Sequence, residues 1–177
     1  MQNFDFEFGA APNVESVRRN VIKSVQRDLE ETELIGILNS ANVGYDLGSG
    51  RGETAVALLE LCPNLRELHA VDLGIAVSSP ETRKIIGNIL KTHDKTRINV
   101  FLEQAAKGEL KKADVVMMAL VPTHRFNEVS YKNLGSCING GGILIELGDT
   151  NLHPDHMRNY FNLRQGKASM RNYWIKK

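Results

Sequence analysis

Three glycines at alternate positions, directly after a short apolar strand, constrain the fold of this chain more than any other feature. The segment Asn42-Val-Gly-Tyr-Asp-Leu-Gly-Ser-Gly-Arg-Gly52 carries glycines at positions 48, 50 and 52, and a helix-forming stretch begins at Glu53. Because glycine lacks a β-carbon and tolerates positive φ, the backbone of such a turn can lie directly against a ligand. The pattern predicts a strand–turn–helix unit that holds a nucleotide-derived ligand.

A single carboxylate marks the end of the next strand. The stretch Arg66–Asp72 has the composition of a second strand, and it runs into Val71-Asp72-Leu73-Gly74. An acid at this place is the usual acceptor for ribose hydroxyls in nucleotide-binding α/β units. We therefore predict that Asp72, with Leu73 beside it, binds the ribose of a nucleoside cofactor.

The glycine spacing separates two kinds of cofactor. Dinucleotide folds use G-x-G-x-x-G, with a pyrophosphate on the helix N-terminus. Here the third glycine comes one residue early, and the carboxylate of Glu53 would repel a diphosphate. Asp46, two residues before the first glycine, favours a cationic ligand. S-adenosylmethionine fits this site because its amino group and its sulfonium are positive, and an NAD(P)-dependent oxidoreductase is the less favoured alternative.

The motif D-x-G-x-G-x-G, from Asp46 to Gly52, resembles motif I of the class I S-adenosylmethionine-dependent methyltransferases, and the resemblance extends over about residues 42–150. It implies that Asp46 faces the methionine amino group and that Asp72 accepts from both ribose hydroxyls. It also implies that Gln104, in Leu102-Glu103-Gln104-Ala105, lies beside the adenine. The residues that would line the cofactor on the first turn are Gly48, Ser49, Gly50 and Gly52.

The order of elements predicts an α/β fold: a doubly wound, mostly parallel sheet of the seven-stranded type, with helices on both faces. The chain then has a helical N-terminal segment at 1–40, packed on a methyltransferase domain at 41–177, in one domain overall. Expected helices cover 14–25, 31–38, 53–61, 79–90, 105–111, 125–138 and 154–161, and expected strands cover 43–47, 66–72, 97–102, 113–120, 143–147 and 168–175.

The end of the fourth strand carries none of the familiar catalytic motifs. DNA and glutamine N-methyltransferases place Asn/Asp-Pro-Pro-Tyr there, and catechol-type enzymes place a metal-binding Asp. This chain has Val121-Pro122-Thr123-His124. His124 is the titratable group near the expected methyl-transfer site that suits a general base near neutral pH. The competing interpretation is a histidine at the start of a helix with no chemical role. Asp149 alone offers too few oxygen ligands for a divalent ion, so no metal is expected.

Two acceptor classes remain open. The run Gly140-Gly-Gly-Ile-Leu-Ile-Glu-Leu-Gly-Asp149 resembles small-molecule O-methyltransferases of the macrocin type. The sequence Tyr45-Asp-Leu-Gly-Ser-Gly50 resembles the corresponding segment of non-SET histone-lysine methyltransferases. The acceptor is thus a small molecule or a protein lysine. A different class of function, a catalytically weak cofactor-binding partner of another subunit, stays as an alternative.

Composition restricts the partners. The net charge of +1 predicts no global attraction to nucleic acid, and no apolar run is long enough to span a membrane. Two cysteines without a metal spacing, and an acidic N-terminus unlike a signal peptide, favour a reduced cytoplasmic location. The basic, aromatic-rich segment 158–177 could bind nucleic acid, but a closing strand pair is the preferred interpretation. His153 and His156 are expected to be solvated and not to bind a metal.

Overall fold

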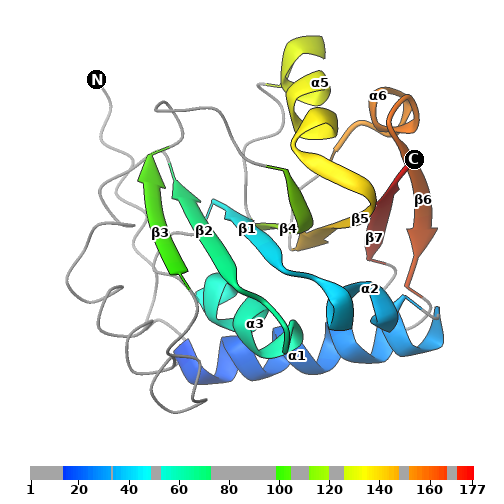
Figure 1. Ribbon diagram of the computed structural model, residues 1–177. Helices are drawn as coiled ribbons and strands as arrows, with labels where there is room; N and C mark the ends of the chain where they lie inside the picture. The colour runs from blue at the N-terminus through cyan, green and yellow to red at the C-terminus, as the bar shows by residue number, and fades with distance from the viewer. Residues whose placement is uncertain are drawn as a thin grey trace, which may run out of the picture.

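A seven-stranded sheet with helices on both faces forms the centre of the computed structural model (Figure 1). The structure describes residues 14–32, 34–48, 53–72, 99–104, 112–119, 126–147, 152–166 and 171–177. Its strands are β1 (Val43–Leu47), β2 (Glu67–Asp72), β3 (Asn99–Gln104), β4 (Ala113–Ala119), β5 (Ile138–Leu147), β6 (Phe161–Gln165) and β7 (Asn172–Lys176). Its helices are α1 (Val14–Glu31), α2 (Ile35–Ser40), α3 (Glu53–Leu61), α5 (Glu128–Ser136) and α6 (Pro154–Arg158).

The strands lie in the order β3-β2-β1-β4-β5-β7-β6. The pairs from β3 to β5 are parallel, and β7 runs antiparallel to both of its neighbours, β5 and β6. This arrangement confirms the predicted doubly wound, mostly parallel sheet of seven strands.

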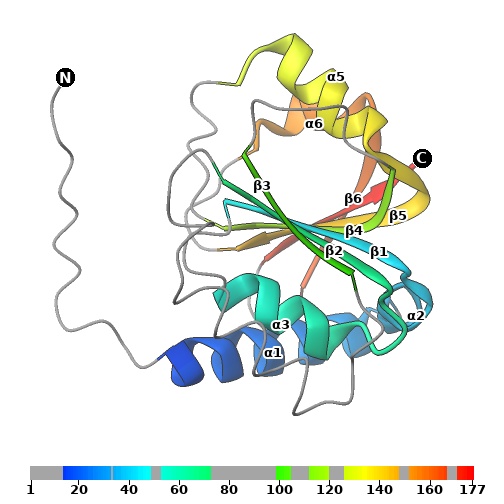
Figure 2. The same cartoon turned by 60° about the vertical axis from the view of Figure 1, so that its left-hand side comes forward.

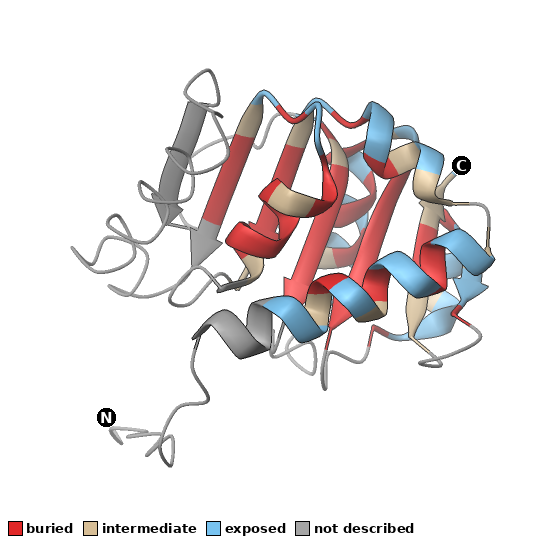
Figure 3. Cartoon of the chain, turned by 90° about the horizontal axis from the view of Figure 1, so that it is seen from below, coloured by how far each residue is buried: buried red, intermediate tan, exposed pale blue. Residues whose placement is uncertain are grey.

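Two apolar layers cover the two faces of this sheet. The helices α1, α2 and α3 lie on one face, and α5 and α6 lie on the other (Figure 2). The central strand β4 is buried on both sides, because its residues 115–118 are all inaccessible to solvent. Burial on both faces explains why its sequence is a continuous apolar run. Figure 3 shows the buried strands behind α1, whose outward surface is exposed.

Helix α1 is held against the sheet by apolar and polar contacts. Its inner face buries Val25 and Leu29 completely. On the same face, the fully buried Asp28 carboxylate accepts a hydrogen bond of 2.8 Å from the Tyr173 hydroxyl. The Arg171 guanidinium lies 3.8 Å from that carboxylate. The N-terminal helix is thereby tied to β7, at the other end of the chain.

Several predicted boundaries were wrong. The helix expected at 125–138 is the shorter α5, because Asn127 caps its start. The Asn127 side chain accepts from the Ser130 N–H, and the Ser130 hydroxyl accepts from the Asn127 N–H. Strand β5 begins at Ile138 and not at Ile143, because Ile138 pairs with Ala113 before a bulge in the ladder. The chain passes this bulge with Gly141 at a φ of 78°.

The helix expected at 154–161 ends at Arg158, and Phe161 begins β6, which forms with β7 the strand pair expected within 158–177. The third strand lies two residues later than expected, at Asn99–Gln104, and the last strand starts at Asn172. The helices expected at 79–90 and 105–111 lie outside the described residues. No helix in the described part of the chain is both long enough and apolar enough to cross a membrane.

The strand order reverses between β1 and β4. From β1 the chain adds β2 and then β3 on one side, and it crosses back to place β4 on the other side of β1. In open α/β sheets the crevice at such a reversal, outside the carboxyl ends of the strands, is where ligands bind. The residues at the carboxyl ends of β1, β2, β3 and β4 are therefore the candidates for a ligand-binding site.

Candidate functional site

Asp46 and Gly48 occupy the carboxyl end of β1, at the point of reversal. The Asp46 side chain is fully buried, and both of its oxygens lie within hydrogen-bond distance of the Thr54 hydroxyl, at 2.8 and 2.7 Å. Gly48 has a φ of 80°, a conformation that favours glycine over any residue with a β-carbon. The first part of the glycine turn thus leaves β1 as the sequence predicted.

The Asp46–Thr54 contact brings a negative charge to the first turn of α3. Thr54 is the second residue of that helix. A pyrophosphate in a dinucleotide fold uses the same place, where the helix N–H groups and dipole attract anions. A buried carboxylate there opposes a diphosphate and suits a positively charged group. The residues present therefore fit S-adenosylmethionine better than a dinucleotide.

Asp72 and Gln104 are neighbours at the adjacent edge of the sheet. Each is the last residue of its strand, and the β2–β3 register pairs them directly. In a parallel sheet the carboxyl ends of neighbouring strands share one edge, so both residues follow Asp46 along the same edge. The backbone thus brings together three of the residues predicted to bind the cofactor.

The remaining predicted site residues lie outside the described residues. They are Ser49, Gly50, Gly52 and Leu73 of the cofactor set and the candidate base His124. Their roles stay predictions.

Glu146 is a polar residue of this end of the sheet that the sequence reasoning did not select. It lies one residue before the end of β5, and its side chain is only 3% exposed. One oxygen accepts from the Leu152 N–H at 2.9 Å, and the other accepts from the Trp174 indole at 2.7 Å. Burial raises the pKa of this carboxyl, while the bonds from Leu152, Trp174 and Asn172 lower it in part. Glu146 joins β5, β7 and the start of α6.

Both polar residues that were missed, Thr54 and Glu146, left only weak signals in the sequence. Glu146 is the single charged residue in the apolar run 143–147, and a buried polar residue of this kind is informative. Thr54 resembles any other residue in a first helical turn. Its partner, eight residues earlier, becomes evident only once the turn has folded.

The two histidines near α6 belong to an aromatic cluster. The His156 ring stacks on the Tyr131 ring with 4.9 Å between centroids, and His153 meets His156 edge to face at 5.1 Å. The Tyr131 hydroxyl also accepts from the His153 N–H at 3.1 Å. Within the described ranges, no group of three or more His, Cys, Asp or Glu side chains is arranged to hold a metal ion.

The basic C-terminal segment is largely engaged within the protein. Lys177 donates to the Arg158 carbonyl at 2.7 Å, and the Lys176 ammonium lies 5.3 Å from the centre of the Tyr160 ring. Arg171 lies against Asp28 and donates to Ser24 at 3.1 Å. Half of the segment, residues 161–165 and 172–176, folds as the antiparallel pair β6–β7. Arg171, Lys176 and Lys177 therefore have partners within the protein.

Comparison with solved structures identifies the fold. An O-methyltransferase family protein from Burkholderia thailandensis aligns over 93% of this chain and 59% of its own, with a TM-score of 0.53 and 18% identity. A methyltransferase from Geobacter sulfurreducens aligns over 96% of this chain and 91% of its own, with a TM-score of 0.58 and 12% identity. Coclaurine N-methyltransferase, bound to N-methylheliamine and SAH, aligns over 78% of this chain and 38% of its own, with a TM-score of 0.53 and 16% identity.

The chain has the fold of the class I, Rossmann-like S-adenosylmethionine-dependent methyltransferases. It spans less than two thirds of the length of the Burkholderia protein and of coclaurine N-methyltransferase. No family model matches the sequence, and no curated protein matches it.

Proposed function

We propose that this protein is an S-adenosylmethionine-dependent methyltransferase that transfers a methyl group to an oxygen or nitrogen acceptor. The observation that carries the proposal is the buried Asp46 carboxylate, which lies at the first turn of α3 where the strand order reverses. A negative charge at this place attracts the positively charged amino group and sulfonium of the methyl donor and repels a diphosphate.

The cofactor residues follow from their places on the sheet edge. Asp46 would favour the positively charged methionine end, and Asp72 would accept from the ribose hydroxyls. Gln104, opposite Asp72 in the register, would lie beside the adenine. The positive φ of Gly48 supports a close approach of the turn to the ligand.

When bound, S-adenosylmethionine would supply a methyl group on a positively charged sulfur, which is already activated for displacement. The protein then has to align the acceptor lone pair with that methyl group and to exclude water. His124 is our candidate for the group that removes a proton from the acceptor. We propose that the acceptor is either a small molecule or a protein lysine.

Calorimetry provides the first test. The purified protein is titrated separately with S-adenosylmethionine, S-adenosylhomocysteine and NADH. We expect heat with the first two ligands and none with NADH. No heat with either methyl-donor ligand at millimolar concentration would overturn the proposal, and tight NADH binding in their place would support an oxidoreductase.

Transfer is tested with S-adenosylmethionine that carries a labelled methyl group. Label should move to a member of a mixed panel of phenols, amines and lysine peptides. Heat with S-adenosylhomocysteine together with no transfer to any acceptor would favour the alternative, a cofactor-binding partner of another subunit. The two assays therefore separate cofactor binding from catalysis.

A further inference from the structure

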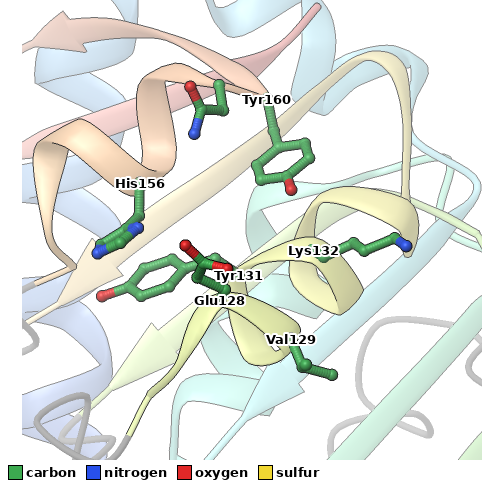
Figure 4. Close-up of a pocket in the computed structure, with 7 residues that line it drawn as sticks. Glu128, Val129, Tyr131, Lys132, His156 and Tyr160 are labelled. Atoms are coloured by element: carbon green, nitrogen blue, oxygen red, sulfur yellow. The ribbon is translucent and has the colours of Figure 1, made fainter.

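A pocket of about 290 Å³ lies between α5 and α6, apart from the residues assigned to the cofactor (Figure 4). Helix α5 contributes its first turn and the residues just after it, and α6 with its following turn contributes the facing side. These helices come after β4 and β5, two strands whose carboxyl ends lie at the edge of the sheet where open α/β folds bind ligands. The lining residues are Glu128, Val129, Tyr131, Lys132, His156, Asn159 and Tyr160.

The aromatic part of the pocket wall is fixed by packing. Tyr131 is 4% exposed, and its ring is stacked on His156. The Tyr160 ring packs against the backbone of Gly135, so closely that a β-carbon at Gly135 would lie 2.8 Å from the ring. The start of α6 is held in turn by the bond from the Leu152 N–H to Glu146. A pocket with rigid walls loses little conformational entropy when a ligand enters.

Two opposite charges stand at the pocket without partners. Glu128 and Lys132 are four residues apart on α5, a spacing that usually allows a side-chain ion pair. Neither forms an ion pair with another residue in the part of the chain that the structure describes. Val129, which lies between them in the sequence, has 62% of its surface exposed. Among the described residues it is the one large hydrophobic side chain that is exposed.

This combination specifies a ligand chemistry. A volume of about 290 Å³ is at the lower end of small-molecule pockets, so the occupant is about the size of one ring with short substituents. Charges of opposite sign on positions whose β-carbons are about 5–6 Å apart match a molecule that carries an ammonium and a carboxylate on the same carbon atom. The Tyr160 ring and Val129 offer an apolar surface to the rest of it.

We propose that the α5–α6 pocket binds a small zwitterion, a free α-amino acid with an aromatic or apolar side chain. Its ammonium lies at Glu128, its carboxylate lies at Lys132, and its side chain packs against Tyr160 and Val129. Binding is independent of methyl transfer. The use of this amino acid as the methyl acceptor rests on the proposed function.

The test uses three probes that share one ring and differ in charge: L-phenylalanine, phenethylamine and 3-phenylpropionate. Each is titrated into ¹⁵N-labelled protein, with and without saturating S-adenosylhomocysteine, and amide shifts are followed by NMR. L-Phenylalanine should shift the amides of 128–132 and 156–160, and each single-charge probe should bind about fivefold more weakly, since one ion pair with an exposed side chain contributes up to about 1 kcal/mol.

Matched variants assign each charge. Glu128→Gln should remove the advantage of L-phenylalanine over 3-phenylpropionate, and Lys132→Gln should remove its advantage over phenethylamine. Glu30→Gln, an exposed substitution on α1, is the control and should change nothing.

The proposal is overturned if L-phenylalanine causes no shifts in α5 and α6 up to its solubility limit. It is also overturned if all three probes bind equally well. A failure of S-adenosylhomocysteine to bind would contradict the proposed function alone, because the probe titrations without it still report on this pocket.

Discussion

The Thr54 hydroxyl lies 2.7–2.8 Å from both carboxylate oxygens of Asp46, across the glycine turn that joins β1 to α3. This contact fixes the direction of the fully buried carboxylate and ties the first turn of the helix to the end of the strand. It links the fold to the proposed cofactor site, because the same carboxylate is the group that we propose favours a cationic ligand.

Thr54→Val should therefore lower the free energy of unfolding by about 1.5–3 kcal/mol, because a buried carboxylate loses a hydroxyl donor. Urea unfolding measures this change. Thr54→Ser keeps the hydroxyl and is the matched control, with a loss well below that of valine. A loss in Thr54→Val no larger than that in Thr54→Ser would mean that the hydrogen bond to Asp46 contributes little to stability.

Asp72→Ala should weaken the binding of S-adenosylhomocysteine by about 1–3 kcal/mol, because the ribose hydroxyls lose a charged acceptor. Asp72→Asn retains one neutral acceptor oxygen and should lose less. Calorimetry gives both dissociation constants. An unchanged dissociation constant in Asp72→Ala would remove this residue from the cofactor site.

His124→Ala should reduce turnover by about 10²-fold if this residue is the general base. The measurement is the rate of labelled methyl transfer to whichever acceptor the panel identifies. Binding of S-adenosylhomocysteine by the variant serves as the control and should not change. Turnover close to that of the unaltered protein would remove His124 from the candidate catalytic residues.

Gly166→Ala should destabilise the protein by about 1–3 kcal/mol, because it forces a methyl group into a closely packed contact. A β-carbon at Gly166 would lie 2.5–2.8 Å from the three carboxylate atoms of Asp28, which is fully buried on the inner face of α1. Gly36→Ala is the matched control: nothing lies within 4 Å of its added carbon. Since Gly36 is in α2, alanine there should be neutral or stabilising by up to about 1 kcal/mol. Thermal unfolding compares the two.

The sequence predicted the elements whose signals are local. The strand at β1, the turn at Gly48 and the helix at α3 follow from apolar residues and glycines within twenty positions, and β4 follows from one continuous apolar run. The place of Asp46 at the carboxyl end of β1 could be foreseen for the same reason.

The elements that were missed depend on distant contacts. Three consecutive glycines suggested a break before β5, yet Gly142 is required inside the strand because a β-carbon there would lie 2.8 Å from the Asp114 carbonyl oxygen. The bond that Glu146 accepts from the Trp174 indole joins residues that are 28 positions apart in the sequence. Neither of these two contacts can be predicted from a short window of sequence, because each joins residues that are far apart along the chain.

Glu146 gives the protein a pH-dependent stability of defined sign. Its carboxyl titrates at an ordinary value of 4.5 in the unfolded chain, and burial raises the pKa in the folded state. Between the two pKa values the folded state binds more protons than the unfolded state, so this residue's contribution to stability falls as the pH rises above about 4.5 and levels off beyond the folded pKa. Glu146→Gln abolishes the titration, and its amide cannot accept from both Leu152 and Trp174. Urea unfolding between pH 4 and pH 8 should show the original protein's advantage over Glu146→Gln to be largest at low pH and to shrink as the pH rises. An advantage that grows with pH would mean that the donors around Glu146 outweigh its burial.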